Sequence, residues 1–237
     1  SALAATPPAS WLRWPNRQSP QLACLRQAQT VALFPHEAPM KQMWDERYGR
    51  DEYAYGEEPN AFFKACLDQL PAPGRLLLPG EGEGRNAVYA ARQGWQVYAF
   101  DFSVEGREKA LRLADRYGVE LDYDIADYET ADIEPGVYDA VALIFTHMHE
   151  SIRRKVHRKL AAALRPGGQL FLEAYSPEQL HYGTGGPPNV ELLYAPADLR
   201  EDFSDLEIVQ LEQVEAEIHE GQYHTGLGSV VRLVAKR

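Results

Sequence analysis

Residues 76–86 read Leu-Leu-Leu-Pro-Gly-Glu-Gly-Glu-Gly-Arg-Asn. An apolar run ends here in three glycines at alternate positions, and a helical pattern follows them directly. The next apolar run along the chain ends in Asp101. This order of strand, glycine turn, helix, strand and acid is typical of a nucleotide-type cofactor site. The glycines let the backbone approach a ligand closely, and the acid can accept both hydroxyls of a ribose.

Outward from this stretch, apolar runs alternate with helical patterns. We predict strands at residues 75–79, 96–100, 120–125, 138–145, 169–175, 206–218 and 229–236. Helices are expected at residues 85–93, 104–117, 151–164 and 195–203, with a short one near 61–70. The last two strands flank a hairpin tip at 220–226, and Arg-Pro-Gly-Gly at 165–168 is a sharp break. The sequence therefore predicts an α/β fold: a Rossmann-like, mostly parallel seven-stranded sheet with helices on both faces and a C-terminal antiparallel β-hairpin.

The first part of the chain differs from the rest in composition. Residues 1–39 carry prolines at 7, 8, 15, 20, 35 and 39 and show little periodicity, which predicts an irregular N-terminal extension. Residues 40–237 are expected to form a single domain. Met40 would be a natural start, so we hypothesise that the upstream segment is a variable extension.

Charge and cysteine content narrow the classes of partner. The formal net charge is -11, which disfavours binding to nucleic acid or to anionic membranes. The two cysteines, Cys24 and Cys66, suggest neither a disulfide framework nor a cysteine-based metal site. No apolar run approaches the roughly 20 residues that span a bilayer. These observations favour a cytoplasmic protein.

The spacing of the glycines indicates which cofactor class to exclude. The dinucleotide fingerprint places glycines at relative positions 1, 3 and 6, whereas here Gly80, Gly82 and Gly84 stand at alternate positions. The Gly-Lys-Ser/Thr sequence that completes a phosphate-binding P-loop is also absent after the glycines. The motif therefore argues against both NAD and ATP.

Residues 78–86, Leu-Pro-Gly-Glu-Gly-Glu-Gly-Arg-Asn, resemble motif I of class I S-adenosylmethionine-dependent methyltransferases. The Gly-x-Gly-x-Gly-Arg-Asn pattern is similar to the small-molecule branch that includes tellurite-resistance and thiopurine-type enzymes. Arg-Pro-Gly-Gly at 165–168 and Tyr-Gly-Glu-Glu-Pro-Asn at 55–60 are two further marks of the resemblance. It covers residues 44–237 and implies S-adenosylmethionine as the cofactor.

The resemblance also implies roles for individual residues. The implied cofactor-binding set is Gly80, Glu81, Gly82, Gly84, Asn86, Asp101, Phe102, Ser103, Asp127, Tyr128 and Phe145. The glycines would pass under the methionine part, Asp101 would hold the ribose and Asp127 would accept from the adenine amino group. Phe145 would lie near the sulfonium. Leu78 stands where the family often carries an acid, and Glu81 is expected to supply part of that polarity.

Six side chains are candidates for contact with the substrate. They are Tyr48, His147, His149, Tyr175, His219 and His224. His147 and His149 follow a predicted strand without a recognisable zinc pattern, so we expect them to line a pocket rather than to bind a metal. His219 and His224 lie on the closing hairpin, where a solvated turn is an equal alternative. Related tellurite enzymes carry a functional histidine in a similar hairpin.

The function expected from the resemblance is transfer of a methyl group to a small-molecule acceptor, with a thiol or another soft nucleophile favoured. Holding donor and acceptor in line contributes about 7–11 kcal/mol to such a reaction. A thiol, with a pKa of about 8.5, needs no base. An oxygen or amine acceptor would need His149, His219 or Tyr175 as its proton acceptor. No catalytic residue is therefore assigned.

Two alternatives remain at this point. One is an O-methyltransferase acting on a quinol or another small metabolite. The other is a catalytically inactive S-adenosylmethionine-binding protein, for which Leu78 is the reason. The sequence does not determine the oligomeric state.

Overall fold

The computed structural model describes residues 38–237, in which seven strands form one sheet with the order β3-β2-β1-β4-β5-β7-β6. The strands are β1 (Arg75–Pro79), β2 (Gln96–Asp101), β3 (Asp122–Ile125), β4 (Tyr138–Ile144), β5 (Leu164–Tyr175), β6 (Glu207–Glu220) and β7 (His224–Lys236). The first five are parallel, and β7 runs antiparallel to both of its neighbours. The predicted fold class is confirmed. Of the predicted extension, residues 1–37 lie outside the described residues.

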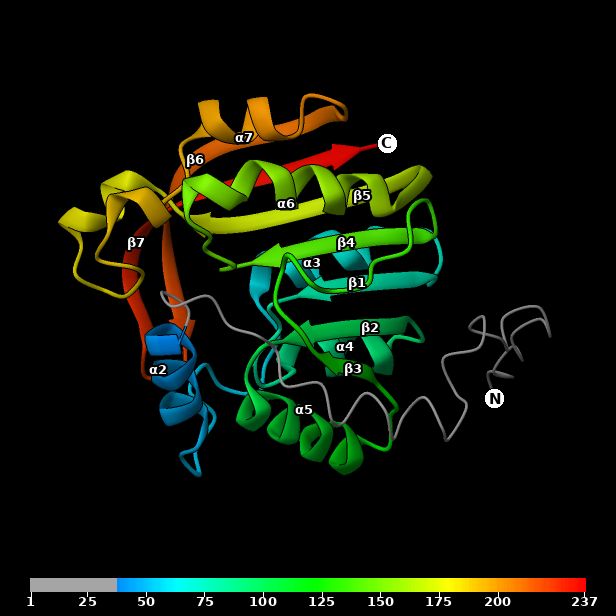
Figure 1. Cartoon of the computed structure of the whole chain (residues 1–237), viewed down its shortest axis with the longest axis vertical. Helices are drawn as coiled ribbons and strands as arrows, with labels where there is room; N and C mark the ends of the chain where they lie inside the picture. Colours follow the sequence, from blue (N-terminus) through cyan, green and yellow to red (C-terminus); the bar gives the residue numbers. More distant parts are fainter. Residues whose placement is uncertain (1–37) are drawn as a thin grey trace. The chain divides into compact units, whose positions relative to one another are not determined.

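Helices cover both faces of this sheet (Figure 1). They are α2 (Ala38–Tyr48), α3 (Ala61–Asp68), α4 (Arg85–Arg92), α5 (Val104–Tyr117), α6 (Glu150–Ala163) and α7 (Pro196–Asp202), with 3-10 helices η2 (Pro177–His181) and η3 (Val190–Leu192). Helix α6 crosses one face, whereas α3 and α4 lie behind the sheet. Local caps set the helix ends: Asn60 accepts from the amide of Phe63 to begin α3, and Ser103 accepts from the amide of Gly106 to begin α5.

The central strand β1 is fixed by an apolar core. Leu76 and Leu78 are fully buried and pack with Phe63, Ala87 and Ala140 from the surrounding elements. Burial of each large apolar side chain contributes about 1.5–3 kcal/mol to folding. The end of β1, where the glycines begin, is therefore held in place by packing against α3 and α4.

The parallel strands all end at one edge of the sheet (Figure 1). Gly80 follows β1, Asp101 ends β2, and Asp127 follows β3, while Phe145 follows β4 and Tyr175 ends β5. Strand order reverses between β1 and β4, and ligands of open α/β sheets bind at such a switch point. This topology brings most of the predicted site residues to one edge.

The closing hairpin is longer than the sequence predicted. Pairing of β6 with β7 continues to Glu220 opposite His224, so the turn covers residues 221–223 rather than 220–226. Gly221, with φ 61°, makes the turn, whereas Gly228 lies within β7. A Cβ at Gly228 would stand 2.8 Å from Oε1 of Gln179, so this glycine allows close packing and does not mark a turn. The tip reaches the neighbourhood of α2 (Figure 1).

The predicted break at 165–168 is also wrong in one respect, because β5 is continuous from Leu164. The strand accommodates Arg-Pro-Gly-Gly through a register shift against β4 between Tyr138 and Ala140. The amide of Gly167 donates to the carbonyl oxygen of Arg237 at 2.7 Å, which gives this segment a backbone partner. Turn-forming residues can therefore be absorbed at a bulge.

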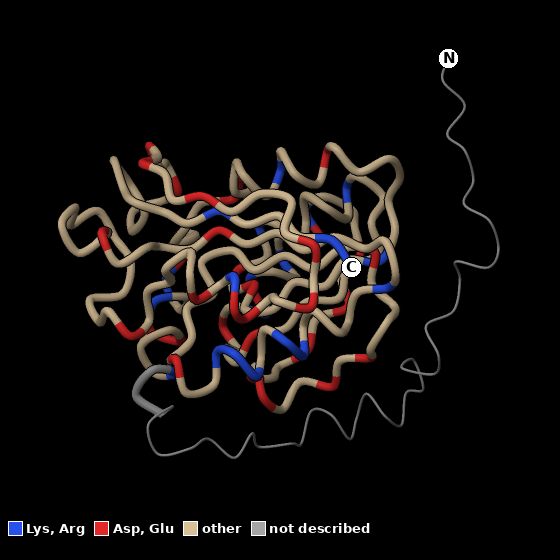
Figure 2. The backbone as a smooth tube through the Cα atoms, turned by 90° about the horizontal axis from the view of Figure 1, so that it is seen from above, with Lys and Arg blue, Asp and Glu red and all other residues tan. Residues whose placement is uncertain are grey.

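The surface of the described fold is mixed in charge. Figure 2 shows Asp and Glu positions distributed along the tube with Lys and Arg positions among them. Among residues 38–237, no helix has the length and apolar character needed to cross a membrane.

Candidate active site

The glycine loop bends sharply after β1. Gly80, Gly82 and Gly84 have φ values of 63°, 58° and 86°, in the left-handed region that favours glycine. A Cβ at Gly82 would stand 2.6 Å from the hydroxyl oxygen of Tyr48, and one at Gly84 would stand 2.5 Å from Cβ of Ala110. The absence of a side chain at Gly82 therefore permits the Tyr48 hydroxyl to approach the loop closely. The absence of one at Gly84 permits α4 to pack against α5.

Asp101 supports this loop from the end of β2. Its Oδ2 accepts from the amide of Gly82 at 3.1 Å, and its Oδ1 accepts from the amide of Ser103 at 2.9 Å. Burial raises the pKa of the Asp101 carboxyl to about 6, because the ionised form loses water. The carboxylate keeps further lone pairs that a ligand hydroxyl can use.

A narrow pocket lies between the ends of β1 and β2 and the loop after β3. Its lining comprises Gly80, Phe100, Asp101, Phe102, Ala126, Asp127 and Tyr128. The ring of Tyr128 packs edge-on against Phe100, with centroids 6.2 Å apart, and a Cβ at Gly80 would collide with the Tyr128 hydroxyl. Oδ1 of Asp127 accepts from two amides of the following turn, Glu129 and Thr130. Five of the predicted cofactor-binding residues therefore line one pocket.

Two other predicted residues bond within the loop region. Oε1 of Glu81 accepts from the amide of Ala87 at 2.8 Å and so satisfies a donor at the start of α4. Burial raises the pKa of Glu81 to about 7. Oδ1 of Asn86 accepts from the amide of Asn60 at 2.9 Å. Glu81 and Asn86 thus hold the loop and the segment before α3 in place.

A buried polar network joins the glycine loop to the hairpin. Arg85 pairs with Glu220 at 2.6 Å, and Arg232 pairs with Glu173 at 2.6 Å. The side-chain Nδ2 of Asn60 donates to both glutamates at 2.7 Å. Although burial opposes ionisation, the neighbouring histidine and Arg85 hold the pKa of Glu220 at about 2. Sequence reasoning missed this network, although Arg85 and Asn60 lie in motifs that it quoted.

An aromatic cluster lies beyond the ends of β4 and β5 and consists of Tyr55, Phe145, His147, Tyr175 and His224. The ring of His224 lies 4.4 Å from Tyr55, 4.7 Å from Phe145 and 5.2 Å from Tyr175, measured between centroids. Phe145 has φ 53°, and no other non-glycine residue in the described range has positive φ. The structure thus brings together four predicted residues, and adds Tyr55, which is not among the predicted site residues.

Three buried polar atoms near this cluster lack a hydrogen-bond partner within the described residues. They are Oγ1 of Thr146, the hydroxyl of Tyr175 and Nδ1 of His224. Nδ1 of His224 is 3.6 Å from Oε2 of Glu220, a distance that a hydrogen bond would shorten. An unsatisfied buried polar group costs about 1–3 kcal/mol. Such atoms gathered at one edge are available to a ligand.

The predicted histidines separate into buried and exposed positions. Nδ1 of His147 lies 2.7 Å from the carbonyl oxygen of Leu192 and donates to it, and burial lowers the pKa of His147 to about 4. Burial likewise lowers the pKa of His224. Both imidazoles are therefore neutral near pH 7.

His149 and His219 are exposed. His149 accepts from the amide of Ser151 at the start of α6, and its Nε2 lies 3.0 Å from Glu191. His219 lies on the outward side of β6, because alternation along the strand buries Glu220 instead. The structure therefore places neither side chain within the aromatic cluster.

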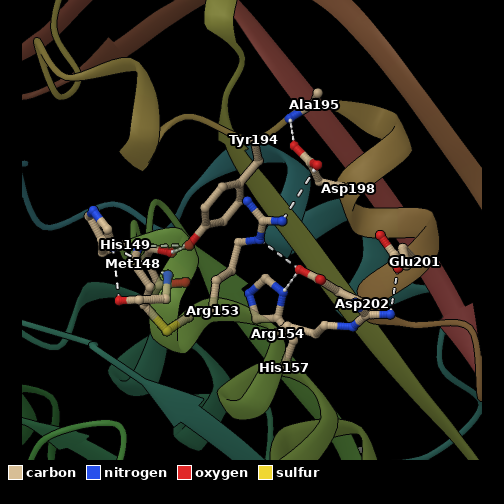
Figure 3. Close-up of polar contacts among 12 residues, drawn as sticks. Met148, His149, Arg153, Arg154, His157, Tyr194, Ala195, Asp198, Glu201 and Asp202 are labelled. Atoms are coloured by element: carbon tan, nitrogen blue, oxygen red, sulfur yellow. Dashed lines mark hydrogen bonds and ion pairs between the residues drawn. The ribbon is translucent and has the colours of Figure 1, made fainter.

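Tyr194 holds the loop after β4 from behind. Its hydroxyl accepts from the amide of Met148 at 2.7 Å and donates to the carbonyl oxygen of Thr146 at 2.8 Å (Figure 3). The amide of Tyr194 also donates to the carbonyl oxygen of Tyr175 at 3.0 Å. One residue thereby fixes the ends of β4 and β5 relative to each other.

A buried ionic group supports Tyr194 between α6 and α7. Oδ2 of Asp202 lies 2.7 Å from Nε of Arg153 and 2.9 Å from Nδ1 of His157 (Figure 3). The guanidinium of Arg153 lies 5.5 Å from the ring centroid of Tyr194. Although burial opposes ionisation, His157 and Arg153 hold the pKa of Asp202 below its usual value. The two helices are thus joined beneath the Tyr194 ring.

The sequence of this region matches a known family. The family model described as a methyltransferase domain matches residues 77–168, which contain the glycine loop, Asp101 and the loop after β4. Residues 77–168 are a methyltransferase domain. The predicted resemblance to methyltransferases is therefore confirmed over residues 77–168.

Curated and solved proteins resemble different lengths of the chain. The ubiquinone biosynthesis O-methyltransferase of Xanthomonas axonopodis pv. citri (strain 306) is 35% identical over 103 residues, 43% of this chain and 43% of that protein. TehB from Haemophilus influenzae has a TM-score of 0.62 at 14% identity, covering 83% of this chain and 66% of that one. The chain thus spans less than half the length of the curated relative.

A second solved structure covers more of both chains. Burkholderia thailandensis 1,6-didemethyltoxoflavin-N1-methyltransferase, with bound 1,6-didemethyltoxoflavin and S-adenosylhomocysteine, has a TM-score of 0.60 at 19% identity. The match covers 86% of this chain and 91% of that one. At these identities the similarity concerns the fold.

Proposed function

We propose that this protein binds S-adenosylmethionine across the glycine loop and transfers its methyl group to a small-molecule acceptor. The observation that carries the proposal is the convergence of the positive-φ glycines, the buried carboxylate of Asp101 and the lining of one pocket at the switch point of the sheet. A nucleoside fits this arrangement, because a carboxylate can hold a ribose and Phe102 and Tyr128 can flank a flat base.

The residues present also fit the charge of this cofactor. When bound, S-adenosylmethionine supplies a methyl group activated by a positively charged sulfur. Phe145 presents an aromatic ring just after β4, the strand next to β1 in the sheet, and aromatic faces attract cations. Oγ1 of Thr146 is a buried oxygen without a partner in the described fold, and Cγ2 of the same residue would lie 3.0 Å from a Cβ at Gly80. Both groups border the place where the sulfonium would lie.

The acceptor would lie against the aromatic cluster. Its rings provide apolar walls, and the Tyr175 hydroxyl and the Thr146 hydroxyl provide hydrogen-bonding groups. A soft nucleophile such as a thiol needs only this positioning and exclusion of water. The chain's own contribution to such a reaction is orientation.

An acceptor that is methylated on a hydroxyl oxygen is the second candidate, and the Glu220–His224 pair favours it. A neutral His224 can accept a proton on one ring nitrogen while the other faces Glu220, which stays ionised beside Arg85. Catalytic hydrogen bonds are often long in ligand-free structures and shorten when substrate binds. The sequence suggested His149, His219 and Tyr175 as proton acceptors. We prefer His224, because His149 and His219 are exposed and burial raises the pKa of Tyr175.

Calorimetry tests the cofactor and turnover tests the acceptor. We expect S-adenosylmethionine and S-adenosylhomocysteine to bind with one-to-one stoichiometry and NADH not to bind. A panel of paired thiols and phenols then measures which acceptor atom is methylated. Binding without turnover on any acceptor would favour an inactive cofactor-binding protein. Absence of binding to either adenosyl compound would refute the proposal.

The proposal extends to the setting of the protein. A small-molecule acceptor, rather than nucleic acid or a membrane, agrees with the formal net charge of -11. The cytoplasm would supply S-adenosylmethionine, so we propose that location, and fractionation of cells expressing the tagged full chain would test it. The single domain proposed for residues 40–237 predicts that a chain beginning at Met40 retains cofactor binding.

A further inference from the structure

Arg47 lies where α2, the segment before α3 and the hairpin tip meet. Its Nη1 donates to the hydroxyl of Tyr55 at 2.7 Å. Its guanidinium carbon lies 4.8 Å from the ring centroid of Trp44 and 4.4 Å from that of Tyr223. These contacts hold the half-buried guanidinium between two aromatic rings. Its position is therefore fixed by parts of the chain that are distant in sequence.

Within residues 38–237, no carboxylate lies within ion-pair distance of Arg47. Arg85, on the other side of the same hairpin tip, shows the usual arrangement, because Glu220 neutralises it at 2.6 Å. Charged side chains that lose water are normally paired. A guanidinium has five N–H donors in a planar fork that matches a carboxylate, and the contacts above use one of them.

Arg47 also lies next to the proposed reaction site. The uncharged ring of Tyr55 lies between Arg47 and His224. Its centroid is 4.4 Å from that of the His224 imidazole. On the other side, the next residue, Tyr48, extends its hydroxyl over Gly82. A ligand that reaches from the glycine loop to the aromatic cluster therefore passes close to an unneutralised positive charge.

We propose that Arg47 binds a carboxylate group of a ligand of this site. This inference rests on the proposed methyl transfer. The carboxylate has two possible sources, the methionine part of the cofactor and an acceptor that is itself an acid. In both cases the guanidinium fork binds both carboxylate oxygens while Trp44 and Tyr223 keep it in place. The strongly acidic chain makes such a local cation necessary for any acidic ligand.

Three variants test the inference in the full-length chain. Arg47→Met removes the charge, Arg47→Lys keeps the charge without the fork, and Arg50→Met is the control, because Arg50 is exposed close by in the sequence. Thermal unfolding establishes that each variant folds, since Arg47 packs on two rings. Calorimetry then compares S-adenosylhomocysteine with 5′-methylthioadenosine, which lacks the carboxylate. Turnover compares 4-mercaptobenzoate with benzenethiol, and 3,4-dihydroxybenzoate with catechol.

If the cofactor supplies the carboxylate, Arg47→Met weakens the binding of S-adenosylhomocysteine at least tenfold and leaves the binding of 5′-methylthioadenosine unchanged. If the acceptor supplies it, both adenosyl compounds bind as before, and KM for the acids rises at least tenfold while KM for the neutral partners does not. Arg47→Lys falls between these values, and Arg50→Met behaves as the original protein does. Unchanged affinities and KM values in Arg47→Met would overturn the inference.

The failure of the proposed function gives a different result. In that case the original protein binds neither adenosyl compound, whatever stands at position 47. Titration of 4-mercaptobenzoate and benzenethiol, followed by NMR of the protein amides, then decides the role of Arg47 separately. Shifts near Tyr55 and Tyr223 that require both the carboxylate and Arg47 support it. Equal shifts in Arg47→Met and the original protein refute it.

Discussion

The two halves of the proposed site are built in different ways. The cofactor half draws its lining from residues 80–128, and its main contacts involve backbone amides and glycine conformations. The acceptor half brings Tyr55, Phe145, Tyr175 and His224 together from distant parts of the chain, and it depends on which side chains stand there. Cofactor binding therefore depends mainly on loop geometry, whereas the choice of acceptor depends on side-chain identity.

This difference predicts separable defects. A change in the glycine loop should remove cofactor binding and leave the aromatic cluster intact. A change in the cluster should alter turnover and leave cofactor affinity intact. A variant in the cluster that abolished cofactor binding would contradict the division into two halves.

The largest effect is expected at the glycine loop. Gly82→Val places a branched side chain where φ is 58°, in the space occupied by the Tyr48 hydroxyl and by the proposed cofactor. Calorimetry should detect no binding of S-adenosylhomocysteine to this variant. Gly84→Ala is the matched comparison, because its Cβ would meet Ala110 between two helices. Gly84→Ala should lower the melting temperature and leave the affinity for S-adenosylhomocysteine nearly unchanged. Loss of affinity without loss of stability would show that the loop follows another path.

The next effect is expected at the hairpin. His224→Gln removes the proposed proton acceptor and should lower kcat for phenol acceptors by about 10²–10⁴-fold, with little change for thiols that ionise unaided. Cofactor affinity should stay the same. His219→Gln is the control, because this exposed histidine lies on the neighbouring strand. Equal losses for thiols and phenols would mean that His224 acts by packing.

Asp101 should show a smaller effect that depends on pH. Burial raises its pKa from 3.8 to about 6, so the carboxylate that is proposed to hold the ribose is lost as pH falls through about 6. Cofactor affinity should then decline on acidification. The contribution of Asp101 to the free energy of unfolding has the opposite trend: it is largest below 3.8 and falls as pH rises through about 6.

Asp101→Asn removes the charge at every pH. It should weaken cofactor binding at pH 8 by about 1.5–3 kcal/mol, the value of a hydrogen bond to a charged group. The step in affinity near pH 6 should disappear with it. Calorimetric titrations between pH 5 and 8, at about half-unit intervals, measure both effects. A step that persists in Asp101→Asn would assign it to another group, such as Glu81.

The smallest effect is expected behind the acceptor half. Tyr194→Phe removes the hydroxyl that bridges Thr146 and Met148. Each lost hydrogen bond costs about 0.5–1.5 kcal/mol, so we expect kcat to fall by about 2–10-fold without a change in cofactor affinity. Hydrogen exchange should increase at the Met148 amide. Tyr182→Phe is the control, because that hydroxyl bonds to Glu215 away from the cluster.

The cofactor half could be predicted from sequence because its signals are local. The glycine spacing and the strand ending in Asp101 are contiguous patterns, and the parallel topology then places Asp127 and Tyr128 beside them. Alternation of strands and helices indicates a parallel α/β sheet, so the fold class was also predictable.

The acceptor half could not be predicted to the same depth. The sequence offered His149, His219 and His224 on similar terms, and only strand alternation and helix capping separate them. The hairpin register decided the matter, because Gly226 and Gly228 resemble turn residues but lie within β7. The partners of Arg85 come from a strand 135 residues further on, and no local pattern encodes such a contact.

The stacking of Tyr48 on Trp44 suggests that tryptophan fluorescence can report cofactor binding. The two rings lie 5.2 Å apart with 29° between their planes, and the Tyr48 hydroxyl stands over Gly82. We expect a molecule that binds on the glycine loop to contact this hydroxyl and so to alter the stack. Indole emission depends on the packing around the ring, so a stopped-flow instrument can record such a change as binding proceeds. The rate of cofactor entry can therefore be followed without any label.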